Sequence, residues 1–219
     1  MIVLALDTAL PACSAAVLDG DRVLAVRSEP MNRGHQERLA PLVAEVMAEA
    51  GVQFTDLQRI GVTVGPGSFT GLRVGLAFAK GLSVALSIPC VGVGSLEALA
   101  ASAVGGGFVV AVIDAKRDQL YVQAFAQGRP LMAPDALAPE VAAARLAELY
   151  SGGPAVLVGP GAHLLEGVIP GARLDPREAA DPLALARLAA AAPEPAHRPR
   201  PLYLRGADAR TIAERAAGL

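Results

Sequence analysis

The chain contains 219 residues, of which 53% are hydrophobic and 18% are charged. This composition supplies enough apolar side chains for a core and excludes a chain that is disordered throughout. The formal net charge of −2 at pH 7 argues against a protein that holds nucleic acid by itself, because binding to phosphates requires a basic field. Cys13 and Cys90 show neither disulfide nor metal-ligand spacing, which fits a reducing cytoplasm.

The N-terminal segment is predicted to form a three-stranded antiparallel meander. Residues 2–7, 13–18 and 22–28 are apolar with alternation, and Asp19-Gly20-Asp21 is a tight-turn signal between the last two. Leu39 and the apolar residues that follow it have helical spacing, which predicts a helix over 37–50 ending at Gly51. Next come a predicted strand over 59–64, a helix over about 70–86, a strand over 91–93 and a helix capped by Ser95.

The triplet Gly105-Gly106-Gly107 marks a linker, after which the pattern starts again. The elements predicted there are strands over 108–113 and 119–125, a helix over 140–150, a strand over 155–158, and a helix that begins at Asp181-Pro182. Two halves that each open with a hairpin indicate a duplicated α/β fold. We expect one lobe over 1–107, a second over 108–202, and a C-terminal tail or helix over 203–219.

A glycine-rich loop follows the strand over 59–64, and its residues are Gly65, Pro66, Gly67, Ser68, Phe69 and Thr70. A strand, a glycine loop and a helix start, in that order, commonly form an anion site, because the first N–H groups of a helix lack intrahelical partners. The spacing of Gly65, Gly67 and Gly71 fits neither the P-loop nor the G-x-G-x-x-G dinucleotide loop. The loop is therefore distinctive without being a generic ATP or NAD site.

At this loop the chain resembles a known family. The segments LALDTALPACSAAV, NRGHQERLAPLVAEV, GPGSFTGLRVGLAFAKGL, IPCVGVGSLEALA, VVAVIDAKRDQLYVQAF and PLYLR are similar to those of the bacterial TsaB (YeaZ) family, which takes part in making threonylcarbamoyladenosine in tRNA. The resemblance covers essentially the whole chain. It implies the actin/Hsp70/sugar-kinase architecture, with two ribonuclease-H-like lobes and a cleft between them.

The resemblance also implies a function and partners. The chain would be a non-catalytic dimerisation subunit that supports a catalytic TsaD-type paralogue, together with a small TsaE-type ATPase, in modifying the adenosine beside the anticodon. It would form a homodimer when alone, meet tRNA only through the complex, and have no contact with a membrane. We expect no cofactor in the isolated chain, with ATP or ADP and a metal entering only in the assembled complex.

The candidate partner interface lies on the helices over 37–50 and 70–86. Its residues are His35, Leu39, Leu42, Val46, Gly71, Arg73, Gly75 and Ala79. Glycine inside a helix costs about 0.8–1.0 kcal/mol relative to alanine, so the stripe of Gly71, Gly75 and Ala79 requires a packing reason. That reason is either close packing within this lobe or an intersubunit helix bundle, and the family resemblance favours the bundle.

Asp7 and Thr8 form a candidate weak nucleotide contact, because related ATPases end their first strand with an acidic residue. Here Pro11 removes an N–H donor and no glycine opens the turn, so a capped turn inherited from an ATPase ancestor is the favoured interpretation. Asp114 starts the corresponding turn of the second half, where Lys116 stands in place of paired glycines. Both phosphate grips therefore look eroded, which argues against an autonomous ATPase.

Other chemistry finds little support in the sequence. In place of the histidine pair that binds a metal in the catalytic paralogue, this chain has His35 followed four residues later by Leu39, too few ligands for a metal. A small-molecule kinase or ATPase and a peptidase acting on the partner remain the alternatives. The basic tail carries Arg198, Arg200, Tyr203 and Arg205, which are candidates for docking on the partner or for approaching tRNA phosphate.

Overall fold

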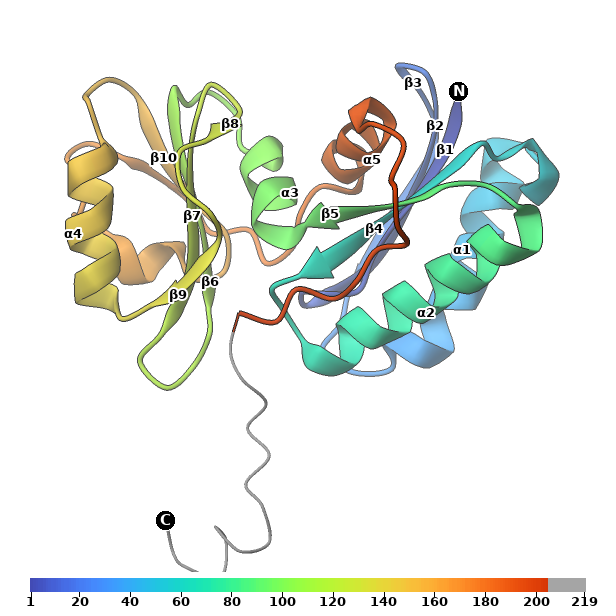
Figure 1. The fold of residues 1–219 in the computed structure, drawn as a ribbon, viewed down its shortest axis with the longest axis horizontal. Coiled ribbons are helices and arrows are strands. Elements are labelled where there is room, and N and C mark those ends of the chain that lie inside the picture. The colour runs from blue at the N-terminus through green and yellow to red at the C-terminus, as the bar shows by residue number, and fades with distance from the viewer. Residues whose placement is uncertain (205–219) are drawn as a thin grey trace, which may run out of the picture.

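Two β-sheets, one from each half of the chain, alternate with layers of helices in the computed structural model, which describes residues 1–204 (Figure 1). The N-terminal sheet has the order β3-β2-β1-β4-β5. Its strands are β1 (Ile2–Asp7), β2 (Ala12–Asp19), β3 (Arg22–Pro30), β4 (Arg59–Gly65) and β5 (Cys90–Gly94). The first three strands are antiparallel, whereas β4 and β5 run parallel to β1.

The C-terminal sheet repeats this plan in a shorter form, with the order β11-β10-β6-β7-β8 and with β9 also paired to β7. Its strands are β6 (Phe108–Asp114), β7 (Leu120–Ala126), β8 (Arg129–Pro130), β9 (Asp135–Leu137), β10 (Ala155–Val158) and β11 (Arg173–Asp175). An antiparallel β6–β7 hairpin comes first, and β10 and β11 are parallel to β6. The duplicated arrangement predicted from the sequence is therefore present.

Five α-helices and two short 3-10 helices complete the described part of the chain. They are α1 (His35–Ala50), η1 (Phe54–Asp56), α2 (Phe69–Leu86), α3 (Ser95–Ser102), α4 (Pro139–Leu149), η2 (Ala162–Leu165) and α5 (Pro182–Ala191). The helices α1 and α2 cover the outer face of the N-terminal sheet, α4 covers the outer face of the C-terminal sheet, and α3 and α5 lie between the sheets. Strand alternation divides β1 accordingly: Leu4 and Leu6 face α1 and α2, while Val3 and Ala5 face α5.

The last described helix returns to the first sheet. Arg59 on β4 donates from Nη1 to the carbonyl oxygens of Ala189, Ala190 and Ala192 at 2.6–3.1 Å, which satisfies the C-terminal carbonyls of α5 and places a positive charge at that end of its dipole. The predicted boundary at residue 107 separates the two sheets in sequence. However, α5 packs on β1, β2 and β4 although it follows the second sheet in the chain.

Most predicted elements are confirmed within one or two residues. Gly51 closes α1 in the left-handed conformation, and Asp181 caps α5 by accepting from Leu183 N. One cap was wrong: Gly94 is the N-cap of α3, and the Ser95 hydroxyl is buried without a hydrogen-bond partner in the described chain. The short strands β8, β9 and β11 were not predicted. The predicted C-terminal helix and Arg205 lie outside the described residues.

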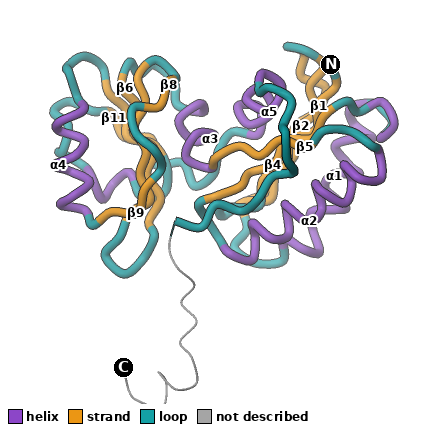
Figure 2. The backbone as a smooth tube through the Cα atoms, in the orientation of Figure 1, coloured by secondary structure: helices purple, strands orange, loops and turns teal. Residues whose placement is uncertain are grey.

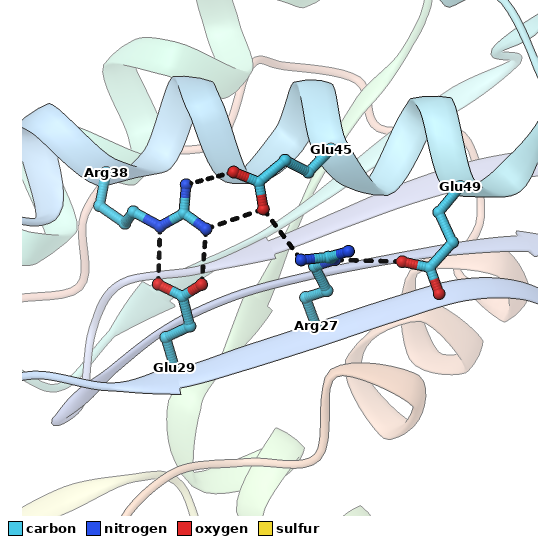
Figure 3. Close-up of polar contacts among 5 residues, drawn as sticks. All are labelled: Arg27, Glu29, Arg38, Glu45 and Glu49. Atoms are coloured by element: carbon cyan, nitrogen blue, oxygen red, sulfur yellow. Dashed lines mark hydrogen bonds and ion pairs between the residues drawn. The ribbon is translucent and has the colours of Figure 1, made fainter.

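An ion-pair network fixes α1 to the edge strand β3 (Figure 3). Arg38 binds Glu29 through Nε at 2.6 Å and Glu45 through Nη1 at 2.7 Å, and Arg27 extends the network from Glu45 to Glu49. The hydrogen bonds from Arg38 lower the pKa of both Glu29 and Glu45. Charged side chains on an edge strand also discourage pairing with another strand.

The helix α2 is long and apolar enough to pass a length-and-composition test for a membrane span. The same test is passed by core helices of soluble proteins, and α2 packs on β4 and α1 with one face inside the N-terminal lobe. The apolar residues on the packed side of α2 are therefore part of the core of its own lobe.

Candidate functional site

A cleft of about 630 Å³ lies where the first hairpins of the two lobes face each other. The β1–β2 turn contributes Ala9 to Pro11, the start of α2 contributes Gly67 and Ser68, and the β6–β7 turn contributes Asp114 to Lys116. This is the place that the duplicated fold creates between its halves, because both turns project from equivalent ends of the two sheets. The cleft is the first candidate for a ligand site.

Asp7 and Thr8 do not line this cleft. Asp7 is 2% exposed, and its Oδ1 accepts hydrogen bonds from Ala9 N at 2.8 Å and from Thr63 Oγ1 at 2.6 Å. Burial raises the pKa of the Asp7 carboxyl, against the opposing effect of these two hydrogen bonds. Thr8 is equally buried and donates from Oγ1 to the Gly71 carbonyl at 2.8 Å. Both side chains are used to hold the turn, as the capped-turn interpretation expects.

The glycine-rich loop packs α2 directly onto that turn. A Cβ atom on Gly71 would overlap the Thr8 carbonyl oxygen, and one on Gly75 would lie 2.6 Å from Thr8 Oγ1. Gly67 lies just as close to Ala9, and Ser68 N donates to the Ala9 carbonyl at 2.8 Å. The stripe of small residues that the sequence singled out therefore serves the close packing of this lobe.

The remaining residues of the loop have separate positions. Gly65 ends β4, Pro66 is buried, Phe69 begins α2, and Thr70 is exposed in its first turn. Ser68 is the N-cap and accepts from Gly71 N at 3.2 Å. The N–H groups of Ser68 and Gly71 at this helix start thus have partners inside the chain. Fewer free N–H groups therefore remain there to bind an anion.

The β6–β7 turn is similarly occupied by its own side chains. Asp114 accepts from Lys116 N at 2.7 Å and from Lys116 Nζ at 2.6 Å, and these contacts lower its pKa. Lys116, Arg117 and Asp118 all have left-handed backbone conformations, with φ of 62°, 54° and 54°. Side chains stand here where paired glycines would let a phosphate approach the backbone.

His35 is the one predicted interface residue that lines the cleft. It is 9% exposed, lies at the start of α1, and its Nε2 has no hydrogen-bond partner within residues 1–204. His163 and Glu178 reach the same cleft from the second lobe. Their sequence positions gave no indication of this, because only tertiary packing brings them together. Within the described chain, no group of three metal-binding side chains forms.

The outer face of α1 and α2 differs from the interface predicted from sequence. His35, Leu39, Leu42, Val46, Gly71, Gly75 and Ala79 are buried in their own lobe, and of the eight predicted residues only Arg73 is exposed. The residues that α1 and α2 do expose include a second set of small side chains, namely Ala40, Ala44, Ala48, Ala77, Gly81 and Ala85. We call these six residues the outer small-residue face. Any partner of α1 and α2 would meet this face instead of the buried stripe.

Comparisons with known proteins agree with this architecture. The family model described as "TsaD: tRNA N6-adenosine threonylcarbamoyltransferase" matches residues 26–157. The "tRNA threonylcarbamoyladenosine biosynthesis protein TsaB" of Escherichia coli (strain K12) is 36% identical over 124 residues, which are 55% of this chain and 53% of that protein. The solved structure "YeaZ from Pseudomonas aeruginosa" is 33% identical, has a TM-score of 0.81, and the match covers 93% of this chain and 99% of that one.

The chain belongs to the TsaB (YeaZ) family. The sequence resemblance is thereby confirmed, as is the actin/Hsp70/sugar-kinase type of α/β fold. A component of the (R)-2-hydroxyglutaryl-CoA dehydratase system of Acidaminococcus fermentans, at 12% identity and a TM-score of 0.54, shares the fold alone. The TsaB-family chain spans about half the length of the curated relatives it matches.

Replacing glycine by alanine should have opposite effects on stability at Gly71 and at Gly81. On an exposed helix position, Gly→Ala stabilises by about 1 kcal/mol, and Gly81→Ala should do so because nothing lies within 4 Å of its new methyl group. Gly71→Ala should instead destabilise the chain by about 2 kcal/mol or more, because the methyl group overlaps the Thr8 carbonyl oxygen. Urea unfolding of both variants measures the difference. Equal stabilisation by both would contradict this packing.

Asp7 predicts a pH-dependent difference between two substitutions. Asp7→Ala should cost about 1–3 kcal/mol because Thr63 and Ala9 each lose a buried acceptor. Asp7→Asn keeps an acceptor oxygen. Since the folded-state pKa of Asp7 is raised, its contribution to stability is largest below the unfolded-state pKa of about 4 and falls as pH rises through the folded value.

The stability of wild type relative to Asp7→Asn should therefore decline over the pH range from the unfolded-state pKa of about 4 up through the raised folded-state pKa. Free energies of unfolding at a series of pH values give this difference directly. A relative stability of wild type that rises over this range would show that the buried carboxyl is held mainly in its charged form.

Proposed function

We propose that this chain is a non-catalytic subunit in tRNA threonylcarbamoyladenosine biosynthesis that pairs with a catalytic TsaD-type paralogue. Membership of the TsaB family supports the process. The observation that supports an accessory role is the state of the two hairpin turns. Asp7, Thr8 and Asp114 have polar atoms engaged within the chain, so a nucleotide phosphate between the lobes would have to compete with these contacts.

The outer small-residue face is the proposed site for the paralogue. Small side chains let helices of two subunits approach closely. In addition, α1 and α2 of this chain carry opposite net charge. Along α1 the exposed acidic residues are Glu37 and Glu49, of which Glu49 also pairs with Arg27, whereas the charged residues of α2 are Arg73 and Lys80. A related lobe that presents its own α1 and α2 across a two-fold axis would place acidic α1 against basic α2. The same complementarity would support a homodimer when the paralogue is absent.

The rest of the proposed assembly follows the family resemblance. A small TsaE-type ATPase would supply the nucleotide chemistry, and tRNA would be bound by the complex as a whole. ATP, ADP and a metal would enter at sites that the paralogue and the ATPase complete. The chain itself would contribute shape and surface.

A bulky side chain on the outer small-residue face should abolish pairing. Ala44→Arg and Ala77→Arg each place a long charged side chain where a partner helix would pack, so capture of the TsaD-type paralogue should fall at least about tenfold. Ala147→Arg on α4 is the matched control, because Ala147 is an exposed helical alanine on the other lobe. Affinity capture and sedimentation of the purified chain measure the two associations. Undiminished capture by both α1 and α2 variants would reject this face.

Reconstitution tests the accessory role itself. The purified chain should show neither ATP turnover nor transferase activity, and calorimetry should detect ATP binding only in the millimolar range, if at all. Mixed with the paralogue and the ATPase, it should restore modification of an unmodified tRNA transcript. Modification that is equally fast without the chain would contradict the proposal. Tight ATP binding by the chain alone would favour the kinase or ATPase alternative.

A further inference from the structure

A basic and aromatic surface lies along α2 on the side away from α1. It is formed by residues along the length of α2, from Phe69 to Lys80, and by residues 193–204, which we call the strap. The strap leaves α5, crosses the N-terminal lobe and ends beside the start of α2 (Figures 1 and 2). The residues that carry the inference are Phe69, Arg73, Lys80, Arg198, Arg200 and Tyr203, here named the strap surface.

The strap is held in place by contacts with the N-terminal sheet. Leu202 N donates to the Val64 carbonyl on β4 at 2.7 Å. Pro199 is buried and packs against Gly92 on β5, where a Cβ atom would lie 2.9 Å from the proline ring. Midway along the strap, Arg198 lines a groove with Ser83 of α2 and with Ser87, the C-cap residue of that helix. The strap surface is thus attached to the lobe by the same sheet that carries α2.

Two aromatic rings are exposed at the end of this surface. Phe69 is 51% exposed and Tyr203 is 46% exposed, with their ring centroids 5.5 Å apart. The Arg73 guanidinium lies 3.8 Å from the centroid of the Phe69 ring, and its Nε is 3.5 Å from the Tyr203 hydroxyl. Rings left this open to solvent are not part of the hydrophobic core. Together with a stacked guanidinium they form a surface on which a planar group can stack.

Four cations lie on α2 and on the strap, two on each, and none of them pairs with a carboxylate within residues 1–204. They are Arg73, Lys80, Arg198 and Arg200. Elsewhere in the described structure, Arg27, Arg38 and Arg177 form ion pairs with neighbouring carboxylates. The strap has one acidic residue, Glu194, at the groove near Arg198. A chain with a net charge of −2 therefore concentrates unneutralised positive charge along one edge of α2.

We propose that the strap surface binds a single-stranded segment of RNA. Arg198 and Arg200 contact the phosphates, and a base stacks on the platform of Phe69, Arg73 and Tyr203. Exposed aromatic rings beside a row of cations are what single-stranded nucleic acid requires, because every base has a face for stacking and every linkage carries a negative charge. An acidic peptide would use the cations without needing the rings. This inference rests on the proposed function only for the identity of the RNA as tRNA.

Two double variants separate the charge from the stacking. Arg198→Glu with Arg200→Glu should lower RNA affinity at least about tenfold and reduce the dependence of log K on log salt by about 1.4, since each phosphate contact contributes roughly 0.7 for single strands. Phe69→Ala with Tyr203→Ala should lower affinity about tenfold, with the salt dependence unchanged. The control is Arg22→Glu with Arg129→Glu, two exposed arginines away from the strap with no ion pair in the described structure.

The measurement is fluorescence anisotropy of a labelled, unmodified tRNA transcript and of a single-stranded RNA of about 12 nucleotides, at about 50 and 200 mM salt. It is made with the full chain and with the reconstituted complex. Thermal unfolding and capture of the paralogue are followed for every variant. The expected result is lower RNA affinity in the strap variants alone, with folding and capture unchanged.

Several results would overturn the inference. These are unchanged RNA affinity in both strap variants, an equal loss in the Arg22 and Arg129 control, or no RNA binding by chain or complex. Loss of paralogue capture together with RNA binding would assign the strap surface to the protein partner. Whether the complex needs this chain for modification is measured separately by omitting it, so the proposed function can stand while the RNA site fails, or the reverse.

Discussion

The contact between α2 and the Thr8 carbonyl is the constraint on which the rest of the structure depends. Gly71 and Gly75 let the helix lie against the backbone of the β1–β2 turn, and the Thr8 hydroxyl closes the contact with a hydrogen bond to the Gly71 carbonyl. No other residue type allows that distance at Gly71. The position of α2 then decides which of its residues are buried, which form the outer small-residue face, and which meet the strap. A helix displaced by even one methyl group would alter all three.

This packing uses the groups that a nucleotide-binding relative of the fold would offer to phosphate. The Ser68 N–H is bonded to Ala9, the Asp7 carboxyl to Thr63 and Ala9, and the Asp114 carboxyl to Lys116. The buried hydrogen bonds of Asp7 each contribute roughly 1 kcal/mol, whereas the exposed Asp114–Lys116 pair contributes less. Each contact would have to be broken for the same atom to bind a ligand. In the β1–β2 turn these atoms hold the contacts with β4 and α2, and in the β6–β7 turn they hold the turn itself.

Local spacing was sufficient to predict the long elements, because their signals lie within a few residues. Gly51 and Asp181 end and begin helices as the sequence indicates. The stripe of Gly71, Gly75 and Ala79 was also recognisable, but a sequence does not say which neighbour a small-residue stripe faces. Here it is Thr8, more than sixty residues away along the chain. The pairing of Arg73 with Tyr203 is separated by 130 residues, and His163 joins His35 at the cleft only through the packing of two sheets.

The helix α5 and the strap return to the first sheet, so the N-terminal lobe carries both of the surfaces that we propose to bind partners. Arg59 fixes the end of α5, and Val64 fixes Leu202, so a segment from the end of the described chain becomes part of the N-terminal lobe. Arg73 then lies on the boundary between two surfaces. Toward α1 its helix presents Ala77 and Gly81, small side chains suited to another helix; toward the strap it presents cations and exposed rings. A partner helix on the first surface and an RNA strand on the second would therefore be neighbours across α2. Because both surfaces are carried by the same rigid helix, a change in the packing of α2 on Thr8 would reach them together.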